Sequence, residues 1–373
     1  ITLYHLIFIV KIKNNMTICI IGNGLSALAL AKTLVNQNIY VDLLVKKKNL
    51  KVDKSRTLGI SKSNLDFFDK NIIDVKKLLW KLKKIEIYTE NLQKEKLINF
   101  ENNKDQLFSI IQNYKLSEIL VKSLSVNKYF KKKILKKKIF SYIENYELII
   151  NCDNSNAITN KYFSKKIVKK YNSFAYTTII EHKKILNNSA IQIFTKNGPL
   201  AFLPISNNKT SLVYSVHNSI KKIADIEELI KLYNFKYNIT KINNVSRFEL
   251  KSLNLRSYYH NNVLAFGDLL HKIHPLAGQG FNMTIRDMKI LIDIIKKRHS
   301  VGLPLDKAIN IEFENRLKHK NFIFSNSIDL IQSFFNFERK KKNKILSKSV
   351  QLIGKNPTLN KVFTKIADKG ILF

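Results

Sequence analysis

Residues 267–282 are the part of this chain best suited to chemistry, and they read GDLLHKIHPLAGQGFN. Glycines let backbone N–H groups approach a ligand closely, and the start of a helix adds partial positive charge. The carboxylate of Asp268 can accept hydrogen bonds from sugar-like hydroxyl groups. A strand-like run, Val263–Phe266, precedes the segment, and a helical pattern follows from Met283. The pattern predicts a loop that holds a large anionic cofactor, in preference to a polar loop with ordinary turn glycines.

A second glycine pattern stands near the N-terminus, where the apolar run Thr17–Ile21 leads into GNGLSA and a helical stretch. In the β-turn-α-β unit that this order predicts, Gly22 permits the tight turn and Gly24 admits a pyrophosphate to the backbone. Ala27 lets the helix and the strand pack closely. The glycines alone fit an ordinary tight turn equally well, but the flanking strand and helix favour a dinucleotide site.

The acidic residue that normally ends the second strand of such a unit is missing. The strand predicted at Ile39–Val45 is followed by Lys46. Asp42 lies three positions before Val45 and therefore points to the opposite face, because side chains alternate along a strand. The contact with the adenosine ribose is left open, whereas the pyrophosphate site is expected.

Together these segments resemble the flavin-dependent aromatic hydroxylases, in particular the ubiquinone-biosynthesis branch of the single-component flavoprotein monooxygenases. Residues 267–282 fit that family's pattern G-D-x-x-H-x-x-H-P-x-A-G-Q-G-x-N at every fixed position. Residues 56–61, RTLGIS, are similar to its Arg-x-x-x-Leu-Ser loop, and residues 198–204, GPLAFLP, are similar to its substrate-domain signature. Residues 313–316 and 329–335 are similar to its C-terminal helices.

The resemblance implies an α/β fold, in which a split Rossmann-like FAD-binding domain carries an inserted antiparallel β-sheet substrate domain and C-terminal helices. We expect an upstream extension at 1–15 and the first part of the FAD-binding domain at 16–165, with an excursion into the substrate domain near 70–110. The β-rich substrate domain is expected at 166–255, and the rest of the FAD-binding domain with the C-terminal helices at 256–373. The pattern also predicts a strand at Ile139–Tyr142 and a helix at Ile223–Tyr233.

The resemblance also assigns site residues. FAD is the implied cofactor, with NAD(P)H as its reductant. Pro275 and His274 are the catalytic candidates beside the reacting flavin carbon, although packing of the cofactor loop is the favoured role of His274. The implied cofactor-binding residues are Gly22, Gly24, Ala27, Arg56, Asp153, Gly267, Asp268, Ala277, Gly278, Gln279, Gly280 and Asn282.

Asp153 stands at a second departure from the family, whose Asp-Gly pair reads Asp153-Asn154 here. Asparagine tolerates left-handed backbone angles, so the turn can survive. The change puts reduction by a nicotinamide in more doubt than flavin binding. The alternative is that Asp153 is a simple turn residue.

The pair His271 and His274 is a weak candidate for metal binding, because no carboxylate or cysteine stands at a convincing spacing. We therefore expect no metal. For His271 we expect a capping or supporting hydrogen bond.

The formal net charge of +37 would ordinarily indicate a nucleic-acid-binding protein. However, 58 of the 65 basic residues are lysine and they are spread along the whole chain. Proteins that read bases and phosphates tend to favour arginine for its bidentate fork. We therefore expect no nucleic-acid partner. The two cysteines, Cys19 and Cys152, fall in or beside predicted strands, which favours free thiols in a reducing cytoplasm.

The function that the resemblance implies is hydroxylation of the aromatic ring of a prenylated phenol precursor in ubiquinone biosynthesis, with O2 and a flavin hydroperoxide. A flavoenzyme with another substrate or electron donor, and a non-catalytic FAD-binding scaffold in a biosynthetic complex, are the alternatives. Attachment to the inner face of the plasma membrane, or to a ubiquinone-biosynthesis complex, also stays open. The aromatic residues at 321–324 and 334–337, followed by Lys340–Lys342, are interpreted in the first place as a core helix that leads into a solvated turn. Docking of this segment on anionic lipid or on a partner subunit is the alternative.

Overall fold

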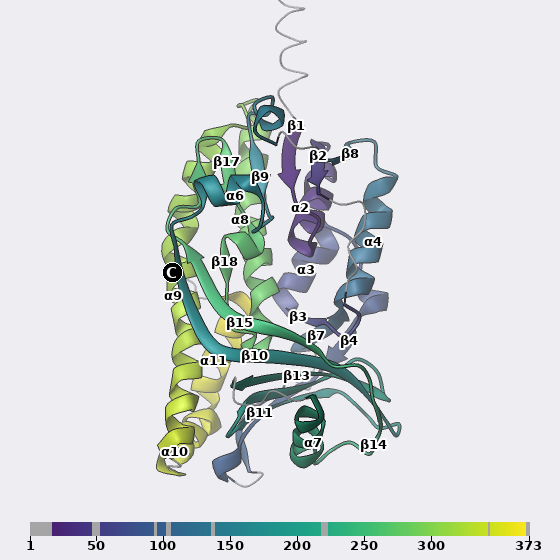
Figure 1. Ribbon diagram of the computed structural model, residues 1–373, viewed down its shortest axis with the longest axis vertical. Coiled ribbons are helices and arrows are strands. Elements are labelled where there is room, and N and C mark those ends of the chain that lie inside the picture. Colours follow the sequence, from purple (N-terminus) through teal and green to yellow (C-terminus); the bar gives the residue numbers. More distant parts are fainter. Residues whose placement is uncertain are drawn as a thin grey trace, which may run out of the picture.

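The computed structural model describes residues 17–46, 53–92, 95–101, 106–135, 139–217, 223–341 and 344–370. The upstream extension predicted at 1–15 lies outside the described residues, and so do Lys342 and the side chains of the two lysines before it. Two main sheets make up the fold, one above the other in Figure 1, with the long helix α9 along one side. No helix in these ranges is both long and apolar enough to cross a membrane.

The upper sheet has six strands in the order β16-β17-β9-β1-β2-β8, all parallel except the edge strand β16. Its four central strands are nearly continuous apolar runs, as expected of a parallel sheet that is covered on both faces. Helix α2 (Leu25–Val35) follows β1, and α8 (Gln279–Ser300) packs against α2. The strands are β1 (Thr17–Ile21), β2 (Tyr40–Val45), β8 (Phe130–Ile134), β9 (Ile149–Asn151), β16 (Tyr259–His260) and β17 (Val263–Ala265).

The lower sheet is mostly antiparallel and is built around β10 (Lys166–His182), which pairs with β13, β14 and β15. Strands β5 and β6, from much earlier in the chain, extend this sheet beyond β11. The remaining strands are β5 (Lys84–Thr89), β6 (Lys96–Glu101), β11 (Ser189–Thr195), β12 (Gly198–Pro204), β13 (Lys209–His217), β14 (Ile239–Ile242), β15 (Ser246–Leu255) and β18 (His271–Lys272).

A small third sheet, β3-β7-β4, joins the two layers. Its strands are β3 (Thr57–Ser61), β4 (Trp80–Leu82) and β7 (Phe108–Gln112). The other helices are α3 (Lys62–Asn71), α4 (Asn113–Ser125), α5 (Ile139–Ile143), α6 (Ala157–Tyr162), α7 (Ile223–Tyr233), α9 (Lys307–Lys341), α10 (Lys344–Lys355) and α11 (Pro357–Lys369).

The helix predicted at Ile223–Tyr233 is confirmed, whereas the strand predicted at Ile139–Tyr142 is wrong because this segment forms α5. Strand β9 already has β1 and β17 as its neighbours in the sheet. The segment before β9 therefore has no free sheet edge beside it, and it packs as one helical turn through Ile143 and Phe140. The α/β class, the split parallel sheet, the large antiparallel sheet and the C-terminal helices are confirmed. The domain boundaries stay a prediction.

Candidate active site

The first glycine turn joins the end of β1 to the start of α2. Gly22 has φ of +124°, which a side chain would strain, and a Cβ there would lie 3.4 Å from the backbone of Cys152 and Asp153. Gly24 is the N-cap residue of α2 and has no atom within 4 Å of the position of a Cβ. No side chain caps this helix start, so its N–H groups are open to an anion. Ala27 is fully buried against the sheet.

The second glycine segment lies directly beside the first. A Cβ on Gly267, whose φ is +65°, would lie 2.7 Å from the side chain of Ser26. The structure therefore brings together two turns that are more than 200 residues apart in the sequence. Asp268 is exposed in the short 3-10 turn that begins at Gly267.

Gly278 closes the loop and forms the N-cap of α8, with φ of +62° and no side-chain cap on the helix. A Cβ on Gly278 would lie 3.5 Å from the backbone nitrogen of Gly59 in β3. Gly280 has no atom within 4 Å of its Cβ position. The backbone of Ala277 lies in the 3-10 turn between Leu276 and Gly278, directly after Pro275. This second helix start is thus also open to a ligand.

Asn282 holds this loop against β3. Its Nδ2 donates to the carbonyl oxygens of Gly59 at 2.9 Å and Gly278 at 3.1 Å, and its Oδ1 accepts from the Ser61 backbone N–H at 3.0 Å. Asn64 Nδ2 donates to the same Oδ1 at 3.0 Å. Both the amide nitrogen and the amide oxygen of Asn282 are hydrogen-bonded to protein groups, so Asn282 holds the loop in position in this structure.

His274 and Gln279 have buried polar atoms that lack protein partners. Among the described residues, both ring nitrogens of His274 and Oε1 of Gln279 have no hydrogen-bond partner. Burial, with a smaller contribution from Lys169, lowers the pKa of His274 to about 3, so the ring is neutral at physiological pH. The ring of Tyr171 meets that of His274 edge-on, with centroids 5.0 Å apart. Because buried polar atoms are normally hydrogen-bonded, these atoms suit polar contacts with a bound cofactor.

His271 makes the supporting contact expected of it. Its Nε2 hydrogen-bonds to Oδ2 of Asp287, and both side chains are buried. Asn321 Nδ2 donates to the other carboxylate oxygen at 3.0 Å, which ties α8 to α9. The described residues contain no group of three or more His, Cys, Asp or Glu side chains able to hold a metal ion.

The carboxylate of Asp153 has protein partners. Its Oδ1 accepts from the backbone N–H and the hydroxyl of Ser155, both at 2.8 Å, and Oδ2 lies 3.5 Å from Lys46 Nζ. This is the geometry of the turn residue that was the alternative for Asp153. Lys46, a residue that the sequence did not single out for the site, thus crosses from the end of β2 to the turn after β9.

Arg56 is exposed just before β3, with its guanidinium 5.2 Å from the ring centre of Phe248. Burial lowers the pKa of Lys272; Asp268 opposes this effect, and Arg56 adds to it. Arg56, Lys272 and Asp268 are therefore electrostatic neighbours on the open side of the loop. Lys272 also went unnoticed in the sequence, because it occupies a variable position of the motif.

Asp42 is turned away from the glycine turns, as its place in the strand predicted. It is 7% exposed, and its Oδ2 accepts from the Tyr146 hydroxyl at 2.5 Å and from Lys133 Nζ at 2.7 Å. Asp42 therefore does not replace the missing ribose-binding acid.

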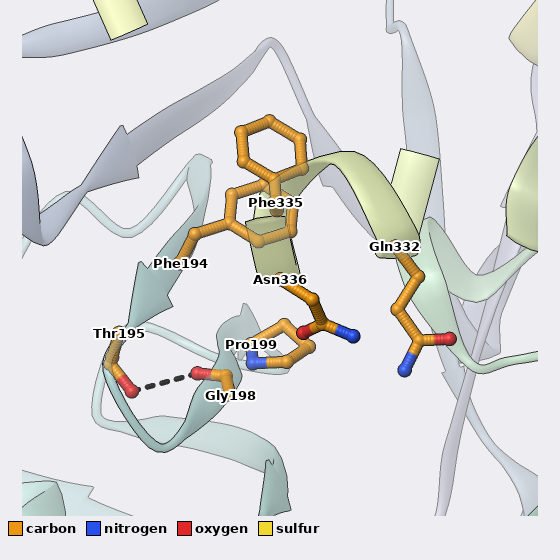
Figure 2. Close-up of a pocket in the computed structure, with 7 residues that line it drawn as sticks. All are labelled: Phe194, Thr195, Gly198, Pro199, Gln332, Phe335 and Asn336. Atoms are coloured by element: carbon orange, nitrogen blue, oxygen red, sulfur yellow. Dashed lines mark hydrogen bonds between the residues drawn. The ribbon is translucent and has the colours of Figure 1, made fainter. Parts of the chain in front are cut away.

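A pocket lies between the β11–β12 hairpin and α9 (Figure 2). The rings of Phe194 and Phe335 stack across it with centroids 3.5 Å apart, and Thr195 Oγ1 donates to the Gly198 carbonyl oxygen at 2.7 Å. Gly198 and Pro199 come from the GPLAFLP segment. Phe194 also packs against an apolar cluster that reaches back to the cofactor loop and consists of Ile273, Leu276, Met283, Phe324 and Ile328.

These features fit FAD. Two uncapped helix starts with open glycines suit the pyrophosphate and the flavin ring, because both carry negative charge or accept hydrogen bonds. The unpartnered nitrogens of His274 and Oε1 of Gln279 supply polar contacts beside them.

Comparison with known proteins agrees with this reading. Residues 221–298 match a family model described as "FAD binding domain". The 3-demethoxyubiquinol 3-hydroxylase of Escherichia coli (strain K12) is 30% identical over 156 residues, which are 40% of each chain. The first curated relatives are thus matched over only about 40% of their length.

Among solved structures, p-nitrophenol 4-monooxygenase PnpA from Pseudomonas putida DLL-E4 superposes with a TM-score of 0.73 at 11% identity, covering 95% of this chain and 98% of the other. Klebsiella pneumoniae HpxO, crystallised with FAD and uric acid, gives a TM-score of 0.71 at 11% identity, covering 95% of this chain and 96% of the other. The chain therefore has the fold of the flavoprotein monooxygenases, and its residues 221–298 match an FAD-binding domain.

Proposed function

We propose that this chain is an FAD-dependent monooxygenase that hydroxylates the aromatic ring of a prenylated phenol in ubiquinone biosynthesis. The observation that carries the proposal is the meeting of the two glycine turns at Ser26 and Gly267, with an uncapped helix start on each side. Bound FAD would take two electrons from NAD(P)H and, with O2, supply the oxygen atom that enters the ring.

The residues of this chain would bind and orient the reactants. The N–H groups at the start of α2, beside Gly24, would hold the pyrophosphate, and Asp268 would accept a hydrogen bond from a ribityl hydroxyl. The start of α8 at Gly278 would place positive charge beside the flavin ring, which stabilises the anionic reduced form.

His274 would bind and orient a ligand instead of accepting a proton. A ring with a pKa of about 3 is neutral near pH 7 and carries one proton on one of its two nitrogens. It can therefore donate one hydrogen bond and accept another, and Pro275 next to it shapes the wall of the loop.

The substrate side is apolar. The cluster around Leu276 and Met283 leads from the cofactor loop to Phe194, which also borders the small pocket of Figure 2. An apolar wall of this kind, formed by the cluster, would exclude water and suit an aromatic ring that carries a hydrocarbon chain. The name of the Escherichia coli relative supports a quinol-type substrate. We also propose that the enzyme works in the cytoplasm at the face of a membrane, where such a substrate is dissolved.

A second candidate is supported by the turn after β9. Because Ser155 and Lys46 occupy the carboxylate of Asp153, this residue is not free to handle a nicotinamide. A flavoenzyme of the same fold with another electron donor is consistent with that contact.

The experiment that tests both candidates uses the purified chain. We expect a yellow protein that releases FAD when it is denatured, and rapid anaerobic bleaching of the flavin by NADPH or NADH. Admission of O2 with a short-chain prenylated phenol should then give a product heavier by one oxygen atom. Bleaching by dithionite but by neither nicotinamide would favour the second candidate, and protein that takes up no FAD would refute both.

A further inference from the structure

We propose that α10 and α11 form a docking surface for anionic phospholipid membranes. The surface, called here the docking face, consists of the exposed apolar residues Leu352, Ile353, Leu359, Val362, Phe363 and Ile366 together with the exposed lysines Lys361, Lys365 and Lys369. The inference adds a specific surface to the membrane location proposed above, but lipid binding itself does not require the hydroxylase activity.

Helix α11 packs with its polar face inward. Asn360 Nδ2 donates to the Asn99 carbonyl oxygen at 2.9 Å, and Asp368 Oδ1 accepts from the Ser63 backbone N–H at 2.9 Å. These two residues and Thr364 between them are spaced four apart and therefore share the inner side of the helix.

The apolar stripe of α11 points the other way. Leu359, Val362, Phe363 and Ile366 follow the spacing i, i+3, i+4, i+7 that places them on one side, and each is about 40% exposed or more. A helix that packs only against its own protein normally turns such a stripe toward the core. Within the part of the chain that the structure describes, this stripe is left exposed, which suits a partner from outside the chain.

Helix α10 repeats this orientation. Gln351 Nε2 donates to the Lys96 carbonyl oxygen at 2.8 Å, and Gly354 lies so close to β6 that a Cβ would be 2.9 Å from Ile98 Cγ1. Leu352 is 69% exposed and Ile353 44%. The close contact at Gly354 leaves no room for a large apolar side chain on the inner face.

The positive charge beside the apolar stripe indicates that its binding partner is anionic. Residues 344–370 contain six lysines and one acidic residue, and that residue, Asp368, is turned inward. Lys361, Lys365 and Lys369 are exposed and spaced four apart, so they share one side of α11, between the apolar stripe and the inner face. Lysines beside an apolar stripe suit a helix that lies in the plane of an anionic bilayer. A second copy of the chain is disfavoured, because each copy carries a net charge of +37.

The docking face would bring the active site to the lipid. Helix α11 packs against α3 and β3, and Gly59 of β3 lies against Gly278 of the cofactor loop. In Figure 1, α11 is the yellow helix at the end of the chain, near the level of β10 and β3. A substrate dissolved in the membrane would therefore reach this side of the site without crossing bulk water.

The test is flotation of the FAD-loaded full chain with liposomes of phosphatidylcholine, with and without 30% phosphatidylglycerol, at about 50 mM and 500 mM salt. We expect binding only to the anionic liposomes at low salt. Each surface lysine raises the partition coefficient about fivefold, the equivalent of about 1 kcal/mol. The triple variant K361Q/K365Q/K369Q should therefore bind about a hundredfold more weakly, and V362S/F363S at least tenfold more weakly.

Matched control variants test whether the location of the substituted residues matters, or only the number of lysines and apolar residues removed. The variant K76Q/K77Q/K81Q removes the same charge from exposed sites elsewhere, and Leu232→Ser removes an exposed apolar residue from α7. Both should bind liposomes like the unaltered chain, and all variants should keep its melting temperature and FAD content. Equal losses in the control and docking-face variants would overturn the proposal, as would a dimer in gel filtration that V362S/F363S alone dissociates. Lipid binding without ring hydroxylation would leave the docking face intact and refute only the proposed function.

Discussion

Gly24→Ala should separate cofactor binding from folding. Gly24 has φ of −73°, an ordinary angle for alanine, and no atom lies within 4 Å of its Cβ position. Alanine is a poorer N-cap than glycine, which costs about 0.5–1 kcal/mol. The smaller conformational entropy of the unfolded chain offsets this by about 0.4–1 kcal/mol. The free energy of unfolding without FAD should therefore change by less than about 0.5 kcal/mol.

The same methyl group would stand where a phosphate must approach the backbone. Loss of one hydrogen bond to a charged group costs about 1.5–3 kcal/mol. That range corresponds to an FAD dissociation constant raised about tenfold to a hundredfold. The change should appear in affinity and not in stability.

The assay is titration of the apoprotein with FAD, followed by quenching of flavin fluorescence, together with urea unfolding in the absence of FAD. Gly267→Ala is the contrasting variant, because its φ of +65° and the Ser26 side chain 2.7 Å away should cost at least about 1–2 kcal/mol of stability. An FAD affinity of Gly24→Ala within twofold of the unaltered chain would refute the placement of the pyrophosphate at this turn.

Three further predictions concern buried polar residues. The folded-state pKa of His274 lies below that of the unfolded chain, so stability should fall by about 1.4 kcal/mol per pH unit as pH decreases from about 6.5 toward 4, and His274→Asn should remove this slope in urea unfolding. Parallel pH profiles for the two proteins would contradict it. Asp287→Ala should cost roughly 3 kcal/mol in urea unfolding because His271 and Asn321 lose their acceptor, whereas Asp66→Ala at an exposed ion pair should cost less than about 0.5 kcal/mol. Equal costs would show that the buried network contributes nothing. Asp42→Asn should lower stability by about 1–3 kcal/mol and leave FAD affinity within twofold, and a tenfold weaker affinity would restore Asp42 as a ribose ligand.

The parts of the fold that follow from local pattern could be predicted from the sequence. The glycine turns, α7 and most strands of the large sheet carry periodic apolar residues and clear punctuation at their ends. Strand β8 was missed because its residues, Phe130–Ile134, are mostly lysine and only its pairing with β2 makes it a strand. The strand predicted at Ile139–Tyr142 was wrong because its β-forming residues have no sheet edge beside them to pair with, and they form α5 instead.

The candidate site was predictable where the residues belong to one continuous motif. The partners that complete it, such as Asp287 for His271 and Lys46 for Asp153, are joined by tertiary packing across separate elements. The spacing of residues along the sequence does not predict contacts between separate elements. Asn282 is intermediate, because its place in the motif was visible whereas its hydrogen bonds to β3 were not.

Strand β10 has a mechanical consequence for turnover. Its first half pairs with β15 over Lys166–Lys170, and after a register shift the same two strands pair again over Ser173–Thr177. The end of β15 pairs in turn with β18, which carries His271. The large antiparallel sheet and the glycine-bearing loop that follows His271 are therefore joined by one ladder, which is interrupted only by the register shift between Lys170 and Ser173. A hinge motion that separated the two sheets would have to break these backbone hydrogen bonds, so a ligand should enter and leave by rearrangement of side chains and not by opening of the two sheets.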